Sequence, residues 1–217
     1  LERKFENLPE LKSLLISGEA SINKLARVAS IANVENDIFL AANVKNLSKS
    51  AVETLVRDEK WNGLQQSSLC SEFVPGHKLE LSEAVKNKLS ELQQKGIDVN
   101  QLLLEFLKKR EAEILEKKER VRERILEKEA LLQEQNKEPS RNIPKAAEKI
   151  LEEEYGTKCA VKNCNKLAEH IHHGLPFSVG KTHDPKLLIP LCKEHHELAH
   201  AVNRQYVKVR AGTVHRA

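Results

Sequence analysis

The chain has 217 residues, enough for one or two modest domains, and 31% of them are charged while only 4% are aromatic. This composition suits a mainly helical protein better than a β-sandwich or a barrel. No apolar run approaches the roughly 20 residues that span a bilayer, so we expect no membrane partner. The net charge is +4, and segment 141–217 carries the excess, with 13 Lys and Arg against 8 Asp and Glu. A basic segment of this kind is expected where a protein meets a polyanion such as DNA.

Cysteine usage favours metal binding in a reducing compartment. Cys159, Cys164 and Cys192 interleave with histidines at the spacings of metal ligands, whereas Cys70 stands alone in a polar stretch. The chain starts at Leu1 without a signal peptide pattern and contains no Met. We therefore expect a cytoplasmic protein whose natural amino terminus lies further upstream.

Residues 1–62 are expected to form a helical N-terminal region. The stretch "SAVETLVR" has the capping-box pattern, with Ser50 followed three residues later by Glu53. The polar stretch 60–76 contains Gly and Pro and is typical of a linker. Another helix is indicated by a capping serine and apolar residues at helical spacing, namely Ser21, Ile22, Leu25, Val28 and Ile31.

The middle segment, 77–138, is expected to contain a strand followed by helices. "HKLELS" (77–82) alternates between apolar and polar residues, a helix should end at Gly96, and another should begin at Asp98 or Asn100. This order is similar to a ribbon-helix-helix unit, in which strands of two chains pair. The segment is therefore expected either to form a homodimer or simply to pack within the chain. Glu80 would face outward from the strand, which argues against reading DNA there.

A long charged helix is predicted at the end of the middle segment. Residues 105–138 hold 10 basic and 10 acidic side chains, which can pair three and four positions apart. Its narrow apolar stripe fits a strut or a weak coiled coil, and consists of Leu107, Ile114, Val121, Ile125 and Leu132. "NKEPSRNIP" ends this helix and begins a C-terminal module, 141–217.

The C-terminal module contains two close pairs of metal-binding residues. A helix from Pro144 to Gly156 precedes "CAVKNC", and a C-x-x-H pair follows downstream. Two such pairs, brought together by a hairpin, form a closed tetrahedral zinc site. We assign to this structural Zn²⁺ site the four residues Cys159, Cys164, Cys192 and His195.

A second group of histidines suggests an open metal site. His196 and His200 lie four residues apart in a predicted helix, so they share one face. His172 and His173 are adjacent in an extended stretch, so they point in opposite directions. One of the two can bind a metal while the other faces a substrate. A site with one ligand from a strand and two from a helix stays incompletely coordinated, as catalysis requires.

These motifs resemble the HNH (His-Me finger) endonucleases, in particular the zinc-stapled bacterial type. The resemblance covers residues 141–203: a Cys pair, "HH" followed by Pro and Ser, a loop, and "LC" continuing as C-x-x-HH-x-x-x-H. The histidine arrangement is similar to that of the colicin DNases. "LPELKSLLISGEASINKLARVASI" and "SRNIPKAAEKIL" also resemble bacterial proteins with a helical region before such a module. The implied fold class is mainly α with a small α+β module, a ββα-metal unit holding a structural zinc.

The resemblance also implies the activity, which is metal-dependent hydrolysis of DNA phosphodiester bonds. His173 would be the general base that deprotonates the attacking water. His172, His196 and His200 would hold a catalytic divalent ion (Mg²⁺, Zn²⁺, Ni²⁺ or Mn²⁺) that neutralises charge on the phosphate and the leaving 3′ oxygen. Basic side chains that could contact DNA phosphates are Lys181, Lys186, Arg204, Lys208 and Arg210.

One position departs from the family pattern. An Asn that orients the general base is expected five residues before the LC cysteine, where this chain has Leu187. His183 or Asp184 could take over that role, or a backbone carbonyl could do so, and we expect reduced rather than absent activity. Two alternatives remain open. The module could bind nucleic acid without cleaving it, or the histidines could serve one larger structural zinc site.

Overall fold

The computed structural model describes residues 1–67 and 80–201, and this part of the chain is mainly helical with one two-stranded antiparallel sheet. Within it, no helix combines the length and the apolar character needed to cross a membrane. The elements, in chain order, are η1 (Arg3–Phe5), α1 (Pro9–Ser17), α2 (Ile22–Val28), α3 (Asp37–Asn46), α4 (Lys49–Ser67), α5 (Glu83–Gln94), α6 (Val99–Glu134), α7 (Lys145–Tyr155), β1 (His170–His173), α8 (Phe177–Gly180), η2 (Pro185–Leu187), β2 (Leu188–Leu191) and α9 (Lys193–His200).

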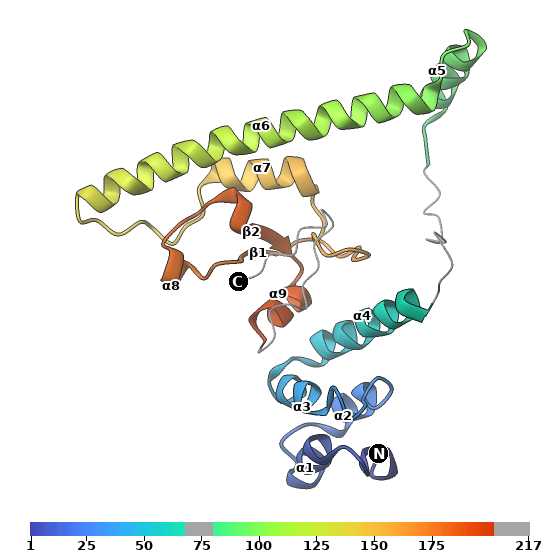
Figure 1. The fold of residues 1–217 in the computed structure, drawn as a ribbon, viewed down its shortest axis with the longest axis vertical. Coiled ribbons are helices and arrows are strands. Elements are labelled where there is room, and N and C mark those ends of the chain that lie inside the picture. The colour runs from blue at the N-terminus through green and yellow to red at the C-terminus, as the bar shows by residue number, and fades with distance from the viewer. Residues whose placement is uncertain (68–79, 202–217) are drawn as a thin grey trace.

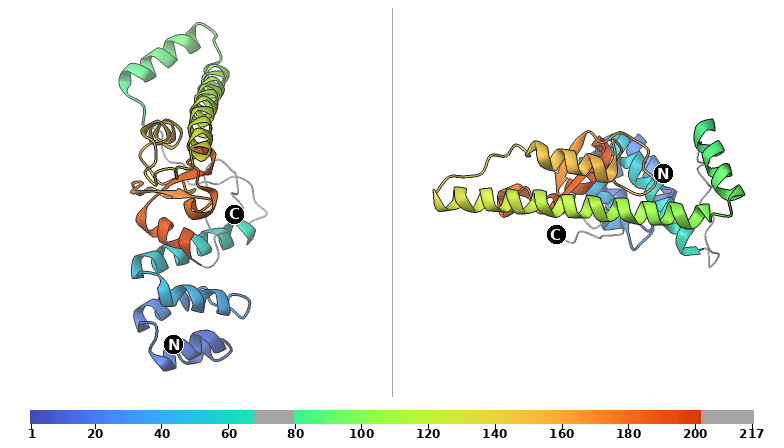
Figure 2. Two further views of the ribbon diagram at one scale, coloured as in Figure 1. Left: turned by 90° about the vertical axis from the view of Figure 1, so that its left-hand side faces the viewer. Right: turned by 90° about the horizontal axis from the view of Figure 1, so that it is seen from above.

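The elements form a stack (Figure 1). Helix α6 lies across α7, α7 contacts β2, the hairpin of β1 and β2 contacts α9, and α9 in turn contacts α4. The other N-terminal helices continue the stack beyond α4, and the view turned by 90° shows the same order (Figure 2). The small hairpin and α9 are therefore held between two helical layers.

The N-terminal helices form one apolar core, as the sequence predicted. Ser21 caps α2 by accepting a hydrogen bond from the backbone N–H of Lys24, and Gly18 ends α1 in the left-handed conformation. The largest fully buried side chains of this core are Phe5, Leu11, Leu25, Leu40 and Leu55. The predicted capping box at Ser50 is wrong, because α4 begins earlier. Ser48 accepts the hydrogen bond from the N–H of Ala51, and Glu53 binds Arg27 on α2.

Helix α1 takes its cap from a residue that is distant in sequence. The Asp37 carboxylate is 3% exposed and accepts hydrogen bonds from the backbone N–H groups of Glu10 (2.9 Å) and Leu11 (3.1 Å). These are among the N–H groups that the first turn of a helix leaves without an intrahelical partner. One buried carboxylate therefore joins α3 to the start of α1.

Replacing Asp37 by Ala should destabilise the protein by about 1–3 kcal/mol, because two buried N–H groups lose a charged acceptor. Urea unfolding followed by circular dichroism measures this change. The Glu35→Ala variant removes an exposed carboxylate two residues away and should unfold close to the wild-type midpoint. Equal midpoints for the two variants would contradict the capping role.

The predicted linker and the middle segment depart from the sequence prediction in three places. The predicted linker is wrong over residues 60–67, where α4 continues to Ser67, and its remainder, with Cys70, lies outside the described residues. Of the predicted strand, residues 80–82 are not in a strand and 77–79, with His77, lie outside the described residues. The two helices expected after Gly96 are one 36-residue helix, α6, which Asp98 caps. Gly96 (φ 77°) does end α5.

The apolar stripe of α6 packs only in its second half. Ile125 is buried and shares a cluster with Ala147 and Leu151 of α7 and Leu188 of β2. Leu107, the first residue of the stripe, is exposed. Helix α6 therefore acts as a strut across the C-terminal module, and the homodimer through this segment stays a prediction.

The hairpin sets the direction of the adjacent histidines. Strands β1 and β2 pair antiparallel, with His172 opposite Ile189 and His173 opposite Leu188. Leu188, Ile189 and Leu191 are buried, so β2 anchors the hairpin while β1 carries the polar side chains. Successive strand residues face opposite sides, which separates the directions of His172 and His173.

Candidate metal centres

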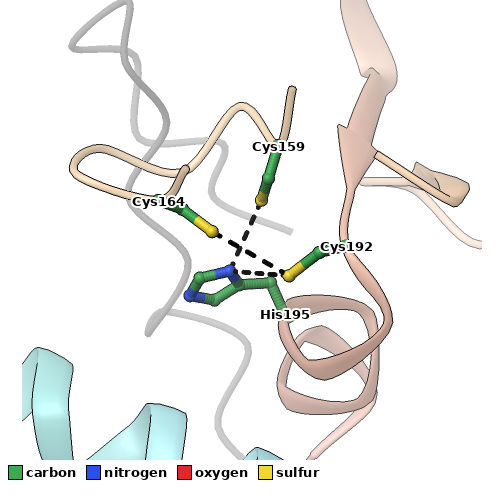
Figure 3. A group of neighbouring side chains, drawn as sticks. All are labelled: Cys159, Cys164, Cys192 and His195. Carbon is green, nitrogen blue, oxygen red and sulfur yellow. Dashed lines mark hydrogen bonds between the residues drawn. The ribbon is translucent and has the colours of Figure 1, made fainter. Parts of the chain in front are cut away.

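Three cysteines and one histidine converge between the end of α7 and the start of α9 (Figure 3). Cys159 and Cys164 lie on a tight loop closed by the bridge between Lys158 and Leu167. Cys192 ends β2 as the N-cap of α9, and His195 lies in the first turn of that helix. All four side chains are buried, and their ligand atoms lie within 4.8 Å of one another.

The spacing of these ligand atoms fits a tetrahedral ion. His195 Nδ1 lies 3.4 Å from Cys159 Sγ and 3.3 Å from Cys192 Sγ, while the Sγ atoms of Cys164 and Cys192 are 4.0 Å apart. Zinc–sulfur bonds of about 2.3 Å in tetrahedral geometry place the sulfur atoms about 3.8 Å apart. The cluster could therefore hold a metal ion.

Without an ion, the three thiols differ widely in pKa. The hydrogen bond between Cys159 and Cys164 raises the pKa of Cys159, as does burial, and lowers the pKa of Cys164 to about 3. Burial is the main cause that raises the pKa of Cys192 to about 11. Because metal ligands must be deprotonated, ion binding here would release protons.

A second group of three imidazoles meets where β1 contacts α9. His172 of β1 and His196 and His200 of α9 bring one ring nitrogen each within 4.8 Å of one another. The Nε2 atoms of His196 and His200 are 3.2 Å apart. His172 is buried and His200 is exposed, so three ligands could hold an ion that keeps a side open to solvent.

A hollow of about 260 Å³ lies beside this triad. It is lined by Ile171, His172, His173, Pro176, Phe177, His196 and His200. His173 contributes to the hollow but its ring contacts Phe177 and His183, away from the triad. The structure therefore brings the predicted triad together and leaves the fourth histidine at its edge, as the strand alternation predicted.

His173 has an oriented ring. Its Nε2 lies 3.2 Å from His183 Nδ1, and His183 Nε2 donates to the carbonyl oxygen of Ser140 at 2.8 Å. Because a carbonyl only accepts, the Nδ1 of neutral His183 must accept, and His173 Nε2 donates to it. His173 Nδ1 then has a lone pair that can take a proton. Burial is the main cause that lowers the pKa of His173, and electrostatic interaction with the neighbouring His183 lowers it further.

The two residues suggested as replacements for the missing Asn have different surroundings. His183 binds His173, whereas the Asp184 carboxylate binds Arg122 Nε at 2.8 Å and the backbone N–H of Lys186. Leu187 contributes its backbone carbonyl, which accepts from the N–H of Gly174 at 2.7 Å. Of the two, only His183 contacts the ring of His173.

Helix α6 holds the loop that carries His183. The Glu129 carboxylate, on α6, accepts from the backbone N–H of His183 at 2.8 Å and is only 8% exposed. Further ion pairs join the loop to the α6 region: Arg122 with Asp184, Glu119 with Lys186 and Glu138 with Lys181. Two predicted phosphate-contacting residues, Lys181 and Lys186, thus already have carboxylate partners. The other three, Arg204, Lys208 and Arg210, lie outside the described residues.

Two contacts near the ligands were not predicted. His170 is exposed, and its ring stacks on His196 with a centroid distance of 4.7 Å. Asp58 of α4 accepts a hydrogen bond from His195 Nε2 at 2.8 Å. The two residues are 137 positions apart, so no local pattern could have revealed the pair. Burial lowers the pKa of His195, but its bonds to Asp58 and Cys164 raise it more.

Comparisons with protein families, with curated proteins and with solved structures found no match for this chain. The site must therefore be interpreted from its own geometry.

Substitutions should separate the two candidate metal centres. Cys164→Ser removes a thiolate from the buried cluster and should lower the metal content by one ion and reduce thermal stability, because ion binding stabilises the folded state. His200→Ala should remove only the ion held by His172, His196 and His200, and it should leave the unfolding temperature nearly unchanged. Elemental analysis and thermal unfolding of both variants test this. Loss of all metal from His200→Ala would instead indicate one shared site.

Proposed function

We propose that this protein is a metal-dependent endonuclease that hydrolyses DNA phosphodiester bonds. The observation that carries the proposal is the meeting of His172, His196 and His200 beside an oriented fourth imidazole, His173. Three ligands leave coordination positions for a substrate, and a base at the same hollow can activate water. The basic excess of the C-terminal segment supports a polyanionic substrate.

The roles of the side chains follow from this arrangement. A divalent ion bound by the triad would supply positive charge for a phosphate oxygen and for the leaving 3′ oxygen. His173 Nδ1 takes a proton from water, and the water oxygen attacks phosphorus as the bond to the 3′ oxygen breaks. The departing oxygen keeps the bonding electron pair and is protonated to a hydroxyl. Imidazole ligands favour Zn²⁺, Ni²⁺ or another transition ion of similar softness over Mg²⁺.

The buried cluster has a structural role in this proposal. Its three thiolates and one imidazole suit Zn²⁺, and a closed set of four ligands leaves no position for a substrate. An ion there would fix the loop of Cys159 and Cys164 to the start of α9. That helix carries His196 and His200, so the closed site would support the open one.

His173→Ala should lower the rate of nicking of supercoiled plasmid DNA by about 100-fold or more, because the attacking water loses its general base. Metal content and unfolding temperature should match the wild type. The matched control is Glu169→Ala, which removes an exposed side chain directly before the same strand and should nick like the wild type. Equal nicking by the wild type and by His173→Ala would remove this base assignment.

His183→Ala should lower the nicking rate by about 10–100-fold, since His173 loses the acceptor that fixes its ring. Asp184→Asn, which changes a residue bound to Arg122 instead, should have a much smaller effect. Single-turnover plasmid nicking at saturating Mn²⁺ compares the two variants. A larger loss in Asp184→Asn than in His183→Ala would contradict the orienting role of His183.

A second candidate function is nucleic-acid binding without cleavage, which Leu187 at the usual Asn position favours. The two functions differ in one measurement. The wild-type protein is loaded with both ions and tested for DNA retardation in a gel and for plasmid cleavage. Retardation without cleavage would support the binding function and exclude the nuclease.

A further inference from the structure

The N-terminal region reaches the buried Cys–His cluster through one residue of α4. Asp58 Oδ2 lies 2.8 Å from His195 Nε2, and the His195 side chain is 1% exposed. His195 Nδ1 faces the sulfur atoms, so Nε2 is the ring nitrogen that points away from the cluster (Figure 3). The Asp58 carboxylate therefore contacts the His195 imidazole on the side away from the sulfur atoms.

This geometry matches the way proteins orient histidine ligands. An imidazole that binds a metal through Nδ1 carries its proton on Nε2, and a carboxylate acceptor there fixes the ring and makes it a better electron donor. Asp58 is itself held in place, because its Oδ1 accepts from Arg57 Nε (3.0 Å) and binds the terminal guanidinium nitrogen at 2.9 Å. The two carboxylate oxygens thus have separate partners.

Two more contacts join the same helices. Glu197 of α9 accepts a hydrogen bond from the backbone N–H of Ser48, just before α4, at 3.1 Å. Leu198 of α9 is 2% exposed and belongs to the core of the N-terminal region. Helix α9 therefore binds the N-terminal region on one side and supplies ligands to both candidate metal centres.

We propose that the N-terminal helical region is part of the buried metal site, with Asp58 as the positioning residue for His195. Ion binding by the cluster and docking of α4 on α9 are then linked, so that each strengthens the other. The inference rests on the Cys–His cluster holding an ion and is independent of nuclease activity.

Docking has a consequence for the open triad. A hollow of about 570 Å³ lies between the two regions, and its lining includes Asn43, Asn46 and Ser48 on one side and His196 and His200 on the other. These two histidines also line the smaller hollow beside His173. The N-terminal region therefore forms one wall of the approach to the triad.

Cobalt binding to the metal-free full-length chain tests the role of Asp58. The thiolate-to-cobalt absorption reports only the cysteine-containing site, so the second site does not interfere. Asp58→Asn and Asp58→Ala should weaken Co²⁺ binding by about 10–100-fold. The matched control is Glu53→Gln, which removes an exposed α4 carboxylate paired with Arg27, and it should bind Co²⁺ like the wild type. Unchanged affinity in both Asp58 variants would overturn the inference.

Hydrogen exchange of the wild type tests the linkage without any substitution. This measurement therefore still tests the proposal if the Asp58 variants do not fold. Removing the metal should increase amide exchange in residues 49–58 of α4, because their partner helix α9 loses its anchor. Residues 83–94 of α5 should exchange equally in both states. Unchanged exchange in α4 would overturn the linkage. Absence of thiolate-to-cobalt absorption in the wild type would overturn the metal site, and this inference with it, while leaving the triad untested by that experiment.

Discussion

The position of helix α9 is the constraint on which the rest of the structure depends. Its eight residues direct His195 toward the three thiols, His196 and His200 toward β1, and Leu198 into the N-terminal core. A helix fixes the angles between successive side chains, so a single rotation about its axis must satisfy all three surroundings. A shift of α9 that improved one of these contacts would break the others. Both candidate metal centres and the contact between the two regions therefore share one geometric solution.

The buried cluster explains how so small a module can have a defined shape. The hairpin has only four residues in each strand, and a two-stranded hairpin by itself is marginally stable in water. Its apolar support is limited to a few side chains, chiefly Leu188, Ile189 and Leu191. An ion bound by the four ligands would add binding free energy to the folded state alone, as small metal-stapled domains require. Helices α7 and α9, which contact the hairpin, then cover its apolar side chains.

The long helix α6 holds the loop of His183 in position, a role that its pattern of charges does not indicate. Its acidic and basic residues nearly balance, and most exposed ion pairs of this kind contribute little to stability. Glu129 is different, because it is buried and binds the backbone N–H of His183. Together with the Arg122–Asp184 pair, it fixes the loop whose histidine orients His173. A helix that resembles a solvated strut thus contributes directly to the geometry of the proposed active site.

The sequence by itself determined the features that depend on spacing within one element. The pairing of His196 with His200, the opposite directions of His172 and His173, and the cap at Ser21 all follow from patterns over a few residues, whereas the choice of Asp98 over Asn100 as a cap came from the structure. It also indicated which four side chains form the Cys–His cluster. The tertiary structure placed His183 rather than Asp184 beside His173, extended α4 into the predicted linker as far as Ser67, moved its cap to Ser48, and brought Asp58 and Glu129 to the C-terminal module. These last contacts join residues 54 and 137 positions apart. Local patterns cannot encode them, because they arise only when whole helices pack against one another.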